Sequence, residues 1–314
     1  MTGADDTTGT APFRGIYPIL PTAFDDAGEF DEASQRRLVD FQIDAGVHGL
    51  VTLANASEGY AVSDAEREQI ARVVIDQTRG RVPVIAGVSH PSAKVAAERS
   101  RAAQDAGASG LLSLPPFYGL WTTDAAGVLA YFDAISRAVR IPVMVQDHPL
   151  SGLPLPAALL ARMAREVEQV RYFKIEVPRA PAKFAATLAL AGERVLGIFG
   201  GANGLLFIDE LARGGCGTMP SGATPEVFVA VYDAFMNGER EKAEALFRHY
   251  LPLIYFENSL GGRNFPKELL HMGGIIRSSN VRSPVPAAWD EPTRQRAHEM
   301  ARQYDLLVLR YAAG

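Results

Sequence analysis

The feature that most constrains the fold is a regular alternation of short apolar runs with longer amphipathic segments. Such alternation is typical of strand–helix units arranged around a parallel sheet. The apolar runs are nearly continuous, as expected for strands buried on both faces. We predict eight strands, at residues 16–20, 49–53, 83–87, 110–114, 142–146, 171–175, 196–199 and 216–219.

A helical pattern follows each predicted strand. These helices are expected at residues 31–45, 63–78, 92–106, 125–138, 156–168, 180–190, 204–213 and 225–237. Eight strand–helix units close naturally into a ring, so we predict an α/β fold of the (β/α)8 TIM-barrel type. An open doubly wound sheet is the weaker alternative, because nothing in the sequence marks a reversal of strand order.

The pattern changes at both ends of this region. Residues 239–255, 264–276 and 292–311 are predicted to be three further helices without strands between them. We therefore expect a barrel over residues 13–237 and a C-terminal helical appendage over residues 238–314. Residues 1–12 contain neither the basic residues nor the apolar core of a signal peptide, and we expect a disordered leader.

The composition excludes several classes of function. The net charge is −5 and no basic run could neutralise a nucleic-acid backbone. No run of ~18 apolar residues could span a membrane. Cys216 is the single cysteine, which excludes disulfides, and we expect it to be a buried core thiol. The histidines have no partners at metal-ligand spacing, so we expect no metal site, and we expect no cofactor. Without a signal peptide or a membrane-spanning run, we expect a cytoplasmic enzyme.

Lys174 is the most unusual polar residue at a predicted strand end. Active sites of such barrels lie at the carboxyl ends of the strands. Side chains alternate along a strand, so Tyr172, Lys174 and Glu176 should share one face, opposite Phe173 and Ile175. Burial disfavours the charged ammonium, and a neutral amine can attack a ketone. The residues alone leave two interpretations open: a nucleophile, or a structural lysine paired with Glu176.

The chain resembles the dihydrodipicolinate synthase and N-acetylneuraminate lyase family of barrel aldolases. The resemblance rests on residues 15–22 (GIYPILPT), 46–53 (GVHGLVTL), 82–88 (VPVIAGV), 115–118 (PPFY), 141–143 (IPV) and 173–174 (FK), with Glu58 and a helix start at 63–67 (SDAER). It implies that Lys174 forms a Schiff base with a 2-oxo acid, such as pyruvate or a pyruvate adduct. It also implies a proton-relay role for Tyr118 across a subunit interface, a place for Met219 over the bound imine, and a homotetramer.

The segment after the second strand departs from the family pattern. The family usually has Gly-Thr-Thr-Gly-Glu there, and its backbone N–H groups and hydroxyls hold the substrate carboxylate. This chain has Ala54, Asn55, Ala56, Ser57 and Glu58 instead. Backbone N–H groups, the Asn55 amide and the Ser57 hydroxyl can still donate hydrogen bonds. We therefore predict a carboxylate site of altered shape at residues 55–57.

The larger departure follows the fifth strand, where the family places a tyrosine that serves as general acid and base. Gln146 occupies that position and cannot exchange a proton near neutral pH. The arginine that synthases use for a dicarboxylic substrate also has no counterpart. These differences argue against a true dihydrodipicolinate synthase. We expect His148 to take over proton transfer, and Glu176 to tune the lysine or hold a substrate hydroxyl.

The glycine pair after the seventh strand supports a second interpretation. Gly200 and Gly201 could let a ligand approach the backbone, and some barrels bind phosphate at such turns. Three functions thus remain: a Schiff-base aldolase or dehydratase, a non-covalent phosphate-binding isomerase or synthase, and a catalytically silent protein that binds a 2-oxo acid.

Overall fold

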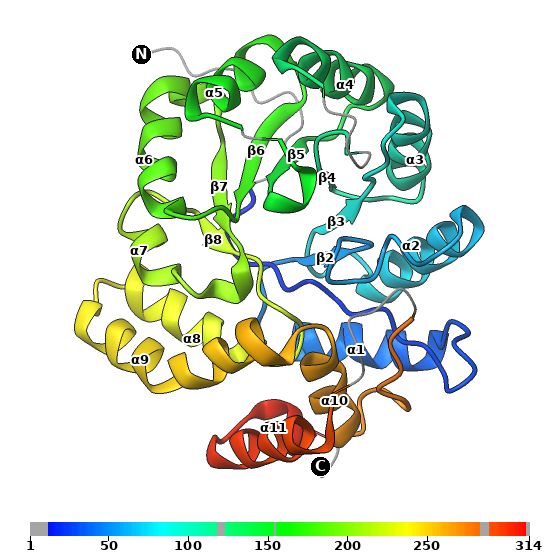
Figure 1. The fold of residues 1–314 in the computed structure, drawn as a ribbon, viewed down its shortest axis with the longest axis vertical. Coiled ribbons are helices and arrows are strands. Elements are labelled where there is room, and N and C mark those ends of the chain that lie inside the picture. Colours follow the sequence, from blue (N-terminus) through cyan, green and yellow to red (C-terminus); the bar gives the residue numbers. More distant parts are fainter. Residues whose placement is uncertain (1–11, 118–122, 154, 283–288, 312–314) are drawn as a thin grey trace.

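The computed structural model describes residues 12–117, 123–153, 155–282 and 289–311. Eight parallel strands form its centre, in the order β1-β8-β7-β6-β5-β4-β3-β2 (Figure 1). Ile19, just beyond β1, pairs with both Val51 of β2 and Ser221 beyond β8, which closes the ring. The predicted TIM barrel is therefore confirmed, and the doubly wound alternative is wrong. The strands are β1 Gly15–Ile16, β2 Leu50–Thr52, β3 Val84–Gly87, β4 Gly110–Ser113, β5 Val143–Asp147, β6 Val170–Ile175, β7 Gly197–Gly200 and β8 Gly217–Thr218.

Helices surround the strands in the predicted order (Figure 1). They are α1 Glu32–Asp44, α2 Asp64–Thr78, α3 Ala93–Asp105, α4 Ala125–Ala138, α5 Ala157–Glu166, α6 Ala180–Ala191, α7 Phe207–Leu211 and α8 Pro225–Met236. Local sequence explains several of their ends. Ser63 forms a capping box with Glu66 at the start of α2, and Asp31 and Asp124 accept backbone hydrogen bonds at the starts of α1 and α4.

The C-terminal part contains α9 Arg240–Phe256, α10 Asn264–Met272, α11 Glu291–Gln303 and α12 Leu307–Arg310. The helix predicted over residues 292–311 is wrong as a single element, because the chain leaves the helix at Tyr304. Tertiary packing decides this break. Leu306 and Val308 are buried, and the N–H of Leu307 donates to a carboxylate oxygen of Glu226 on α8 at 2.9 Å.

The helix predicted over residues 264–276 is also too long. It ends at Met272, because the chain turns through Gly273 and Gly274. A Cβ on Gly273 would lie 2.0 Å from the carbonyl oxygen of Val308, so a side chain cannot fit between α10 and α12. Gly274 adopts φ +68°, a left-handed conformation that glycine tolerates best.

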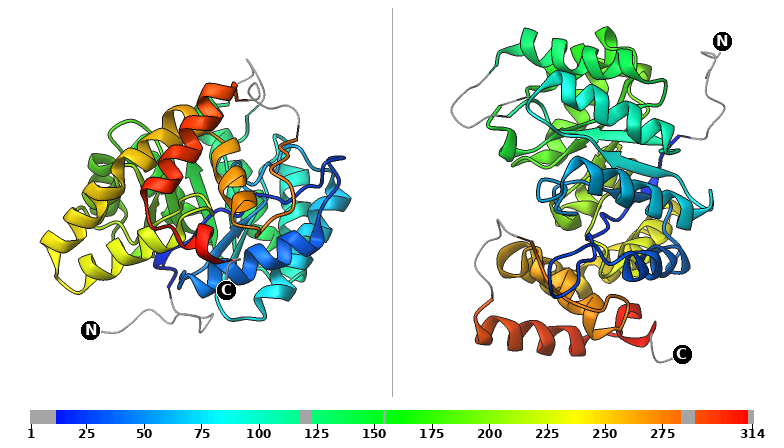
Figure 2. Two further views of the ribbon diagram at one scale, coloured as in Figure 1. Left: turned by 90° about the horizontal axis from the view of Figure 1, so that it is seen from below. Right: turned by 90° about the vertical axis from the view of Figure 1, so that its right-hand side faces the viewer.

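These C-terminal helices pack beside α1, as two perpendicular views show (Figure 2). The Tyr311 hydroxyl donates to Asp44 at 2.6 Å, and the Arg37 guanidinium donates to the carbonyl of Ile275 at 3.0 Å. The boundary predicted at residue 237 stays a prediction. The predicted leader lies outside the described residues, except for Pro12.

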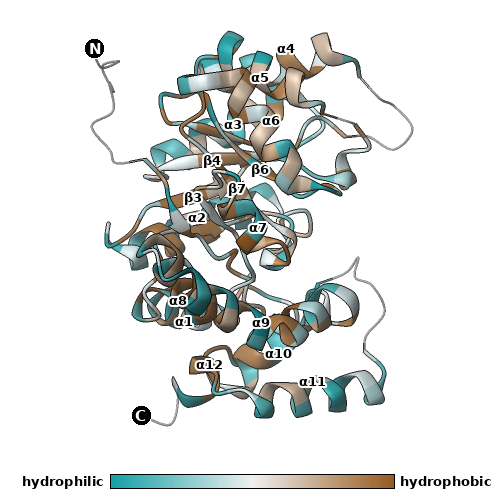
Figure 3. Cartoon of the chain, turned by 90° about the vertical axis from the view of Figure 1, so that its left-hand side faces the viewer, coloured by the Kyte–Doolittle hydropathy of each residue, from teal (hydrophilic) through white to brown (hydrophobic). Residues whose placement is uncertain are grey.

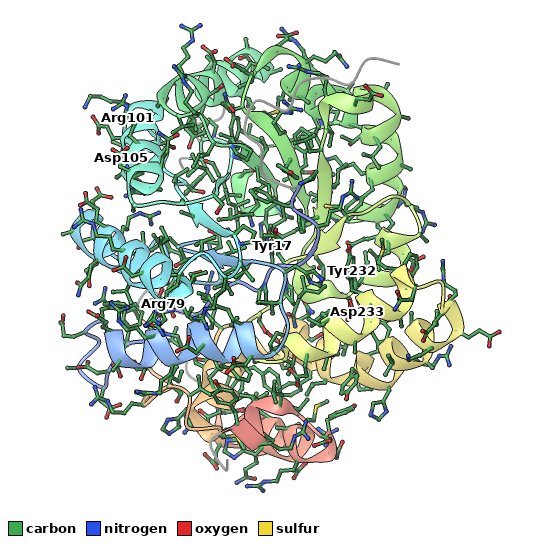
Figure 4. The ribbon with its side chains drawn as sticks, turned by 180° about the vertical axis from the view of Figure 1, so that it is seen from behind. Tyr17, Arg79, Arg101, Asp105, Tyr232 and Asp233 are labelled. Carbon is green, nitrogen blue, oxygen red and sulfur yellow. The ribbon has the colours of Figure 1, made fainter. Side chains whose placement is uncertain are left out.

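Most strand residues are apolar (Figure 3), and their buried side chains pack both inside the barrel and against the helices. Tyr172 belongs to the cluster inside the barrel, whereas Phe173 and Ile175 pack in the layer between strands and helices, which confirms the predicted alternation. Inside the barrel, Phe13 stacks on Tyr172 with ring centroids 4.9 Å apart, and its N–H donates to the Tyr172 hydroxyl at 3.0 Å. Tyr17 lies near the middle of the ring (Figure 4).

Cys216 is buried in this interior cluster, as predicted, and burial raises the pKa of its thiol to about 12. No helix in the described ranges has both the length and the apolar character needed to cross a membrane. Nor do the described residues contain three or more histidine, cysteine or acidic side chains placed to hold a metal ion together.

Candidate active site

Three polar side chains meet at the carboxyl ends of β5 and β6. Lys174 and Gln146 are paired in the parallel register, so their side chains project from the same face of the sheet. Glu176 follows β6 and is on that face too. Its Oε1 lies 3.0 Å from the Lys174 ammonium and accepts a hydrogen bond of 2.6 Å from Gln146 Nε2. The Lys174 side chain is only 1% exposed, so this contact forms in a nearly dry environment.

The second oxygen of Glu176 is held from the neighbouring strand end. The N–H of Ala202, just after β7, donates to Oε2 at 3.0 Å. A Cβ on Gly201 would lie 2.1–2.2 Å from three atoms of the Glu176 side chain. Glycine is therefore needed at position 201 because the carboxylate occupies the space where a side chain would be.

The electrostatic environment keeps Glu176 ionised. Burial alone raises the pKa of its carboxyl, but Lys174, His148, the Ala202 N–H and Gln146 together lower that pKa below its usual range. A carboxylate beside a buried amine can accept a proton from it, or from a molecule bound to it. The site thus places an amine and an ionised carboxylate in direct contact.

His148 lies at the edge of this group, half-buried in the turn after β5. Its Nδ1 accepts a hydrogen bond of 3.0 Å from the N–H of Leu150, which leaves the proton of a neutral ring on Nε2. Burial is the largest effect on this imidazole and lowers its pKa, aided by the charges of Lys174 and Arg263. A neutral ring with an Nε2–H can donate a hydrogen bond toward the site.

Asp147 has a different role from its neighbours. It faces the helical layer, where it forms an ion pair with Lys183 of α6. Burial raises the pKa of its carboxyl, while Lys183 opposes that shift. This ion pair connects β5 to α6 and directs Asp147 away from Gln146 and the other polar side chains of the site.

The loop after β2 has an unusual backbone. Leu53 and Glu58 both adopt left-handed conformations, with φ +58° and +59°. Neither position is a glycine, the residue that adopts this conformation at least cost. Such strain persists only where the surroundings enforce it. Here the Arg67 guanidinium donates to the carbonyls of Gly59 and Gly87 from behind the loop.

The same loop contains polar atoms without partners. Across the described part of the chain, nothing bonds to the buried Asn55 Nδ2 or Ser57 Oγ, and the backbone N–H groups of Asn55 and Ala56 are equally unoccupied. Buried donors are costly when unsatisfied. These atoms lie where a carboxylate site is predicted, although Ala56 can contribute only its backbone.

Glu58 supports the structure instead. Its carboxylate is fully buried and lies 2.5 Å from the ammonium of Lys267 on α10. It also accepts a hydrogen bond of 2.7 Å from the N–H of Arg282. The glutamate that this chain shares with the family therefore fastens the C-terminal segment over the loop.

Two charged residues near the site were missed at the sequence level. Glu210 of α7 packs behind Gly200, and burial raises the pKa of its carboxyl to about 8. Arg263 precedes α10 and reaches the loop after β2. The sequence gives one sign that Arg263 lies at a turn between helices, which is the Gly261-Gly262 pair directly before it.

Of the remaining predicted site residues, the structure describes Met219 and Gly201 but not Tyr118. Met219 is buried in the interior cluster with Met144 and Phe199, and Gly201 faces Glu176. Tyr118 lies outside the described residues. The roles assigned to the individual site residues stay predictions.

Comparisons with known proteins agree with this geometry. The model of the dihydrodipicolinate synthetase family matches residues 12–303. An L-2-keto-3-deoxyarabonate dehydratase of Azospirillum brasilense is 41% identical, over 98% of this chain and 99% of its own length. A 4-hydroxy-tetrahydrodipicolinate synthase of Corynebacterium aurimucosum is 30% identical over 95% and 97%.

A solved structure extends the comparison to the fold. It is that of YagE from Escherichia coli K12, described as a prophage protein of the dihydrodipicolinic acid synthase family in complex with pyruvate. It is 29% identical, with a TM-score of 0.87 over 94% of this chain and 100% of that chain. The barrel and the surrounding helices are thus shared with an experimental structure.

Proposed function

Because the chain belongs to the dihydrodipicolinate synthetase family, we propose that it is a dehydratase of 2-oxo-3-deoxy sugar acids, with Lys174 as its Schiff-base residue. The chain is a divergent member of that family and a pyruvate-type Schiff-base lyase. The choice of dehydration depends on one observation, the Glu176 carboxylate 3.0 Å from the Lys174 nitrogen.

The proposed reaction begins with addition of the Lys174 amine to the C2 carbonyl. Loss of one water gives an iminium, which withdraws electrons from C3. Glu176 removes a proton from C3, and the electron pair forms an enamine. The enamine electrons then expel the C4 hydroxyl, which leaves as water after receiving a proton. Hydrolysis of the remaining imine consumes one water and returns the amine.

The position of the base favours this route over cleavage of the C3–C4 bond. Cleavage requires a group that takes the proton from the C4 hydroxyl, and the resemblance to the family assigns such acid–base work to the tyrosine after the fifth strand. Gln146 replaces the family tyrosine and has no proton to exchange. Glu176 is beside the lysine nitrogen, from which C3 of a bound substrate is two bonds removed. The relative with 41% identity is itself a dehydratase.

The surroundings of Gly200 and Gly201 disfavour the phosphate-binding alternative. The side chain of Glu210 lies directly against Gly200, and the ionised carboxylate of Glu176 lies directly against Gly201. A phosphate there would meet the negative charge of Glu176, which costs free energy instead of providing it. A homotetramer and a cytoplasmic location, both expected from the sequence, stay predictions.

Trapping and turnover test the proposal together. Borohydride with pyruvate should add mass irreversibly at Lys174, and Lys174→Arg should abolish the adduct. The wild-type enzyme should also release a dehydrated 2-oxo acid from L-2-keto-3-deoxyarabonate, and mass spectrometry of the product measures this. An adduct without turnover on any 2-oxo-3-deoxy acid would support the catalytically silent alternative. Release of pyruvate and an aldehyde would instead identify an aldolase.

A further inference from the structure

We propose that Arg263 supplies the positive charge that holds the substrate carboxylate, in cooperation with the donors of residues 55–57. This inference rests on the proposed function, because it concerns the same bound 2-oxo acid. It adds a specificity residue from the C-terminal part of the chain, 208 positions away from the loop it contacts.

The position of Arg263 is fixed by two contacts. Its Nε donates to the carbonyl oxygen of Asn55 at 3.2 Å. Its guanidinium lies over the ring of Tyr60, with the central carbon 4.9 Å from the ring centroid. A cation stacked on an aromatic face is restrained in orientation without using its remaining N–H donors.

Those remaining donors are available. Within the described ranges, the two terminal amino groups of Arg263 form no hydrogen bond and the residue takes part in no ion pair. The one carboxylate of the adjacent loop, Glu58, is already paired with Lys267 and hydrogen-bonded to the Arg282 N–H. The charge of Arg263 is therefore not balanced by the acidic residue nearest to it in that loop.

The neighbouring groups are donors as well. They are the Asn55 side-chain amide, the Ser57 hydroxyl and the backbone N–H groups of Asn55 and Ala56, which lack partners in the part of the chain that the structure describes. A cation among unsatisfied donors matches an anionic acceptor. Guanidinium binds a carboxylate through two parallel hydrogen bonds, so a carboxylate fits the set better than a hydroxyl.

Arg263 is anchored at the loop where the substrate carboxylate is predicted to bind. The charges of Arg263 and Lys174 both act on the His148 ring. In a 2-oxo acid the carboxylate is bonded directly to the carbon that the lysine attacks. Fixing the carboxylate therefore orients that carbon toward Lys174, which lowers the barrier to addition.

A purely structural role makes a different prediction. If Arg263 only ties α10 to the loop after β2, its loss should weaken binding of every ketone and lower the melting temperature. If it binds the carboxylate, its loss should affect charged ketones alone. A ketone without a carboxylate separates the two roles.

The test compares the rates of borohydride-trapped adduct formation with pyruvate and with hydroxyacetone. Arg263→Gln should slow pyruvate trapping about 10- to 100-fold, the effect of losing a charge-assisted hydrogen bond, and leave hydroxyacetone trapping within about twofold. Arg263→Lys should recover part of the loss. Arg294→Gln, an exposed position on α11, is the matched control and should change neither rate.

The possible outcomes are distinguishable. Selective loss with pyruvate supports it. Equal loss with both ketones, or an unchanged pyruvate rate, overturns it while the Schiff-base mechanism stands. Absence of any adduct in the wild-type protein would contradict the proposed function itself and is recognisable as such.

Discussion

Gln146 and Lys174 are register partners on neighbouring strands, and both contact the same carboxylate oxygen of Glu176. Glu176 is therefore fixed by a neutral amide on one side and a cation on the other. The amide can orient the carboxylate without competing for its proton. Where the resemblance to the family expects a tyrosine, this chain thus has a glutamine that holds the carboxylate of Glu176.

Replacement of Glu176 by glutamine separates binding from proton transfer. Glu176→Gln keeps the shape of the side chain but removes the base. We expect kcat of the proposed dehydration to fall about 10²- to 10⁴-fold, as is typical for loss of a general base. Borohydride trapping of pyruvate should stay within about tenfold of wild type, because Lys174 is retained. Turnover within a fewfold of wild type would show that Glu176 is not the base.

Gly201→Ala tests how the carboxylate is positioned. Gly201 adopts φ −142° and ψ −140°, and the Cβ of an alanine there would lie 2.1 Å from Glu176 Cγ. The carboxylate must move, and we expect kcat to fall at least about tenfold. Gly238→Ala is the control, since its left-handed φ of +79° predicts a loss of stability without a loss of activity. Equal kcat for wild type and Gly201→Ala would contradict the arrangement described for Glu176.

Much of the fold follows from the sequence. Period-two alternation predicted that Tyr172 and Phe173 face opposite layers, and all eight strands occur within a few residues of their predicted limits. The local hydrophobic pattern does not predict where α11 ends and α12 begins. That break depends on Leu306 being buried and on Glu226 accepting a hydrogen bond from Leu307, contacts that join distant parts of the chain.

Part of the candidate site could also be predicted from the sequence. The strand-end rule and side-chain alternation predict from the sequence that Lys174, Glu176 and Gln146 lie in one region. Arg263 and Glu210 could not be found this way. Arg263 reaches the site from a different part of the chain, and Glu210 lies within a short helix whose pattern gives no sign that its carboxyl faces inward.

Glu66 makes the stability of the protein depend on pH. A hydrogen bond from the Arg282 guanidinium is the largest influence and lowers the pKa of Glu66 to about 2, from an unfolded value near 4.5. A depressed pKa stabilises the fold above the unfolded value, and this contribution disappears as pH falls toward 2. Both side chains are partly exposed, so we expect on the order of 1–2 kcal/mol after screening.

Glu66→Gln therefore should be less stable than wild type above pH ~5 and equally stable near pH 2. Chemical denaturation across this range measures the difference. Glu68→Gln is the matched control, because Glu68 forms an exposed ion pair with Arg72 at 3.8 Å that should contribute little. A constant difference between wild type and Glu66→Gln at all pH values would assign the effect to the capping box alone.

His148 should determine the acid limit of activity if it transfers a proton. Burial lowers the pKa of the ring below its usual 6.5, and the pKa of Glu176 lies below 4.5. As pH falls between these limits, the ring gains a proton while Glu176 remains ionised. A mechanism that needs neutral His148 thus predicts that kcat declines on the acid side of the ring's ordinary pKa of 6.5. In His148→Asn, kcat at pH 7 should fall at least about tenfold, and the remaining activity should lose this acid limb. The pH profiles of kcat for both proteins measure this.

An unchanged profile in His148→Asn, with kcat within a fewfold of wild type, would assign His148 to capping the turn through Leu150.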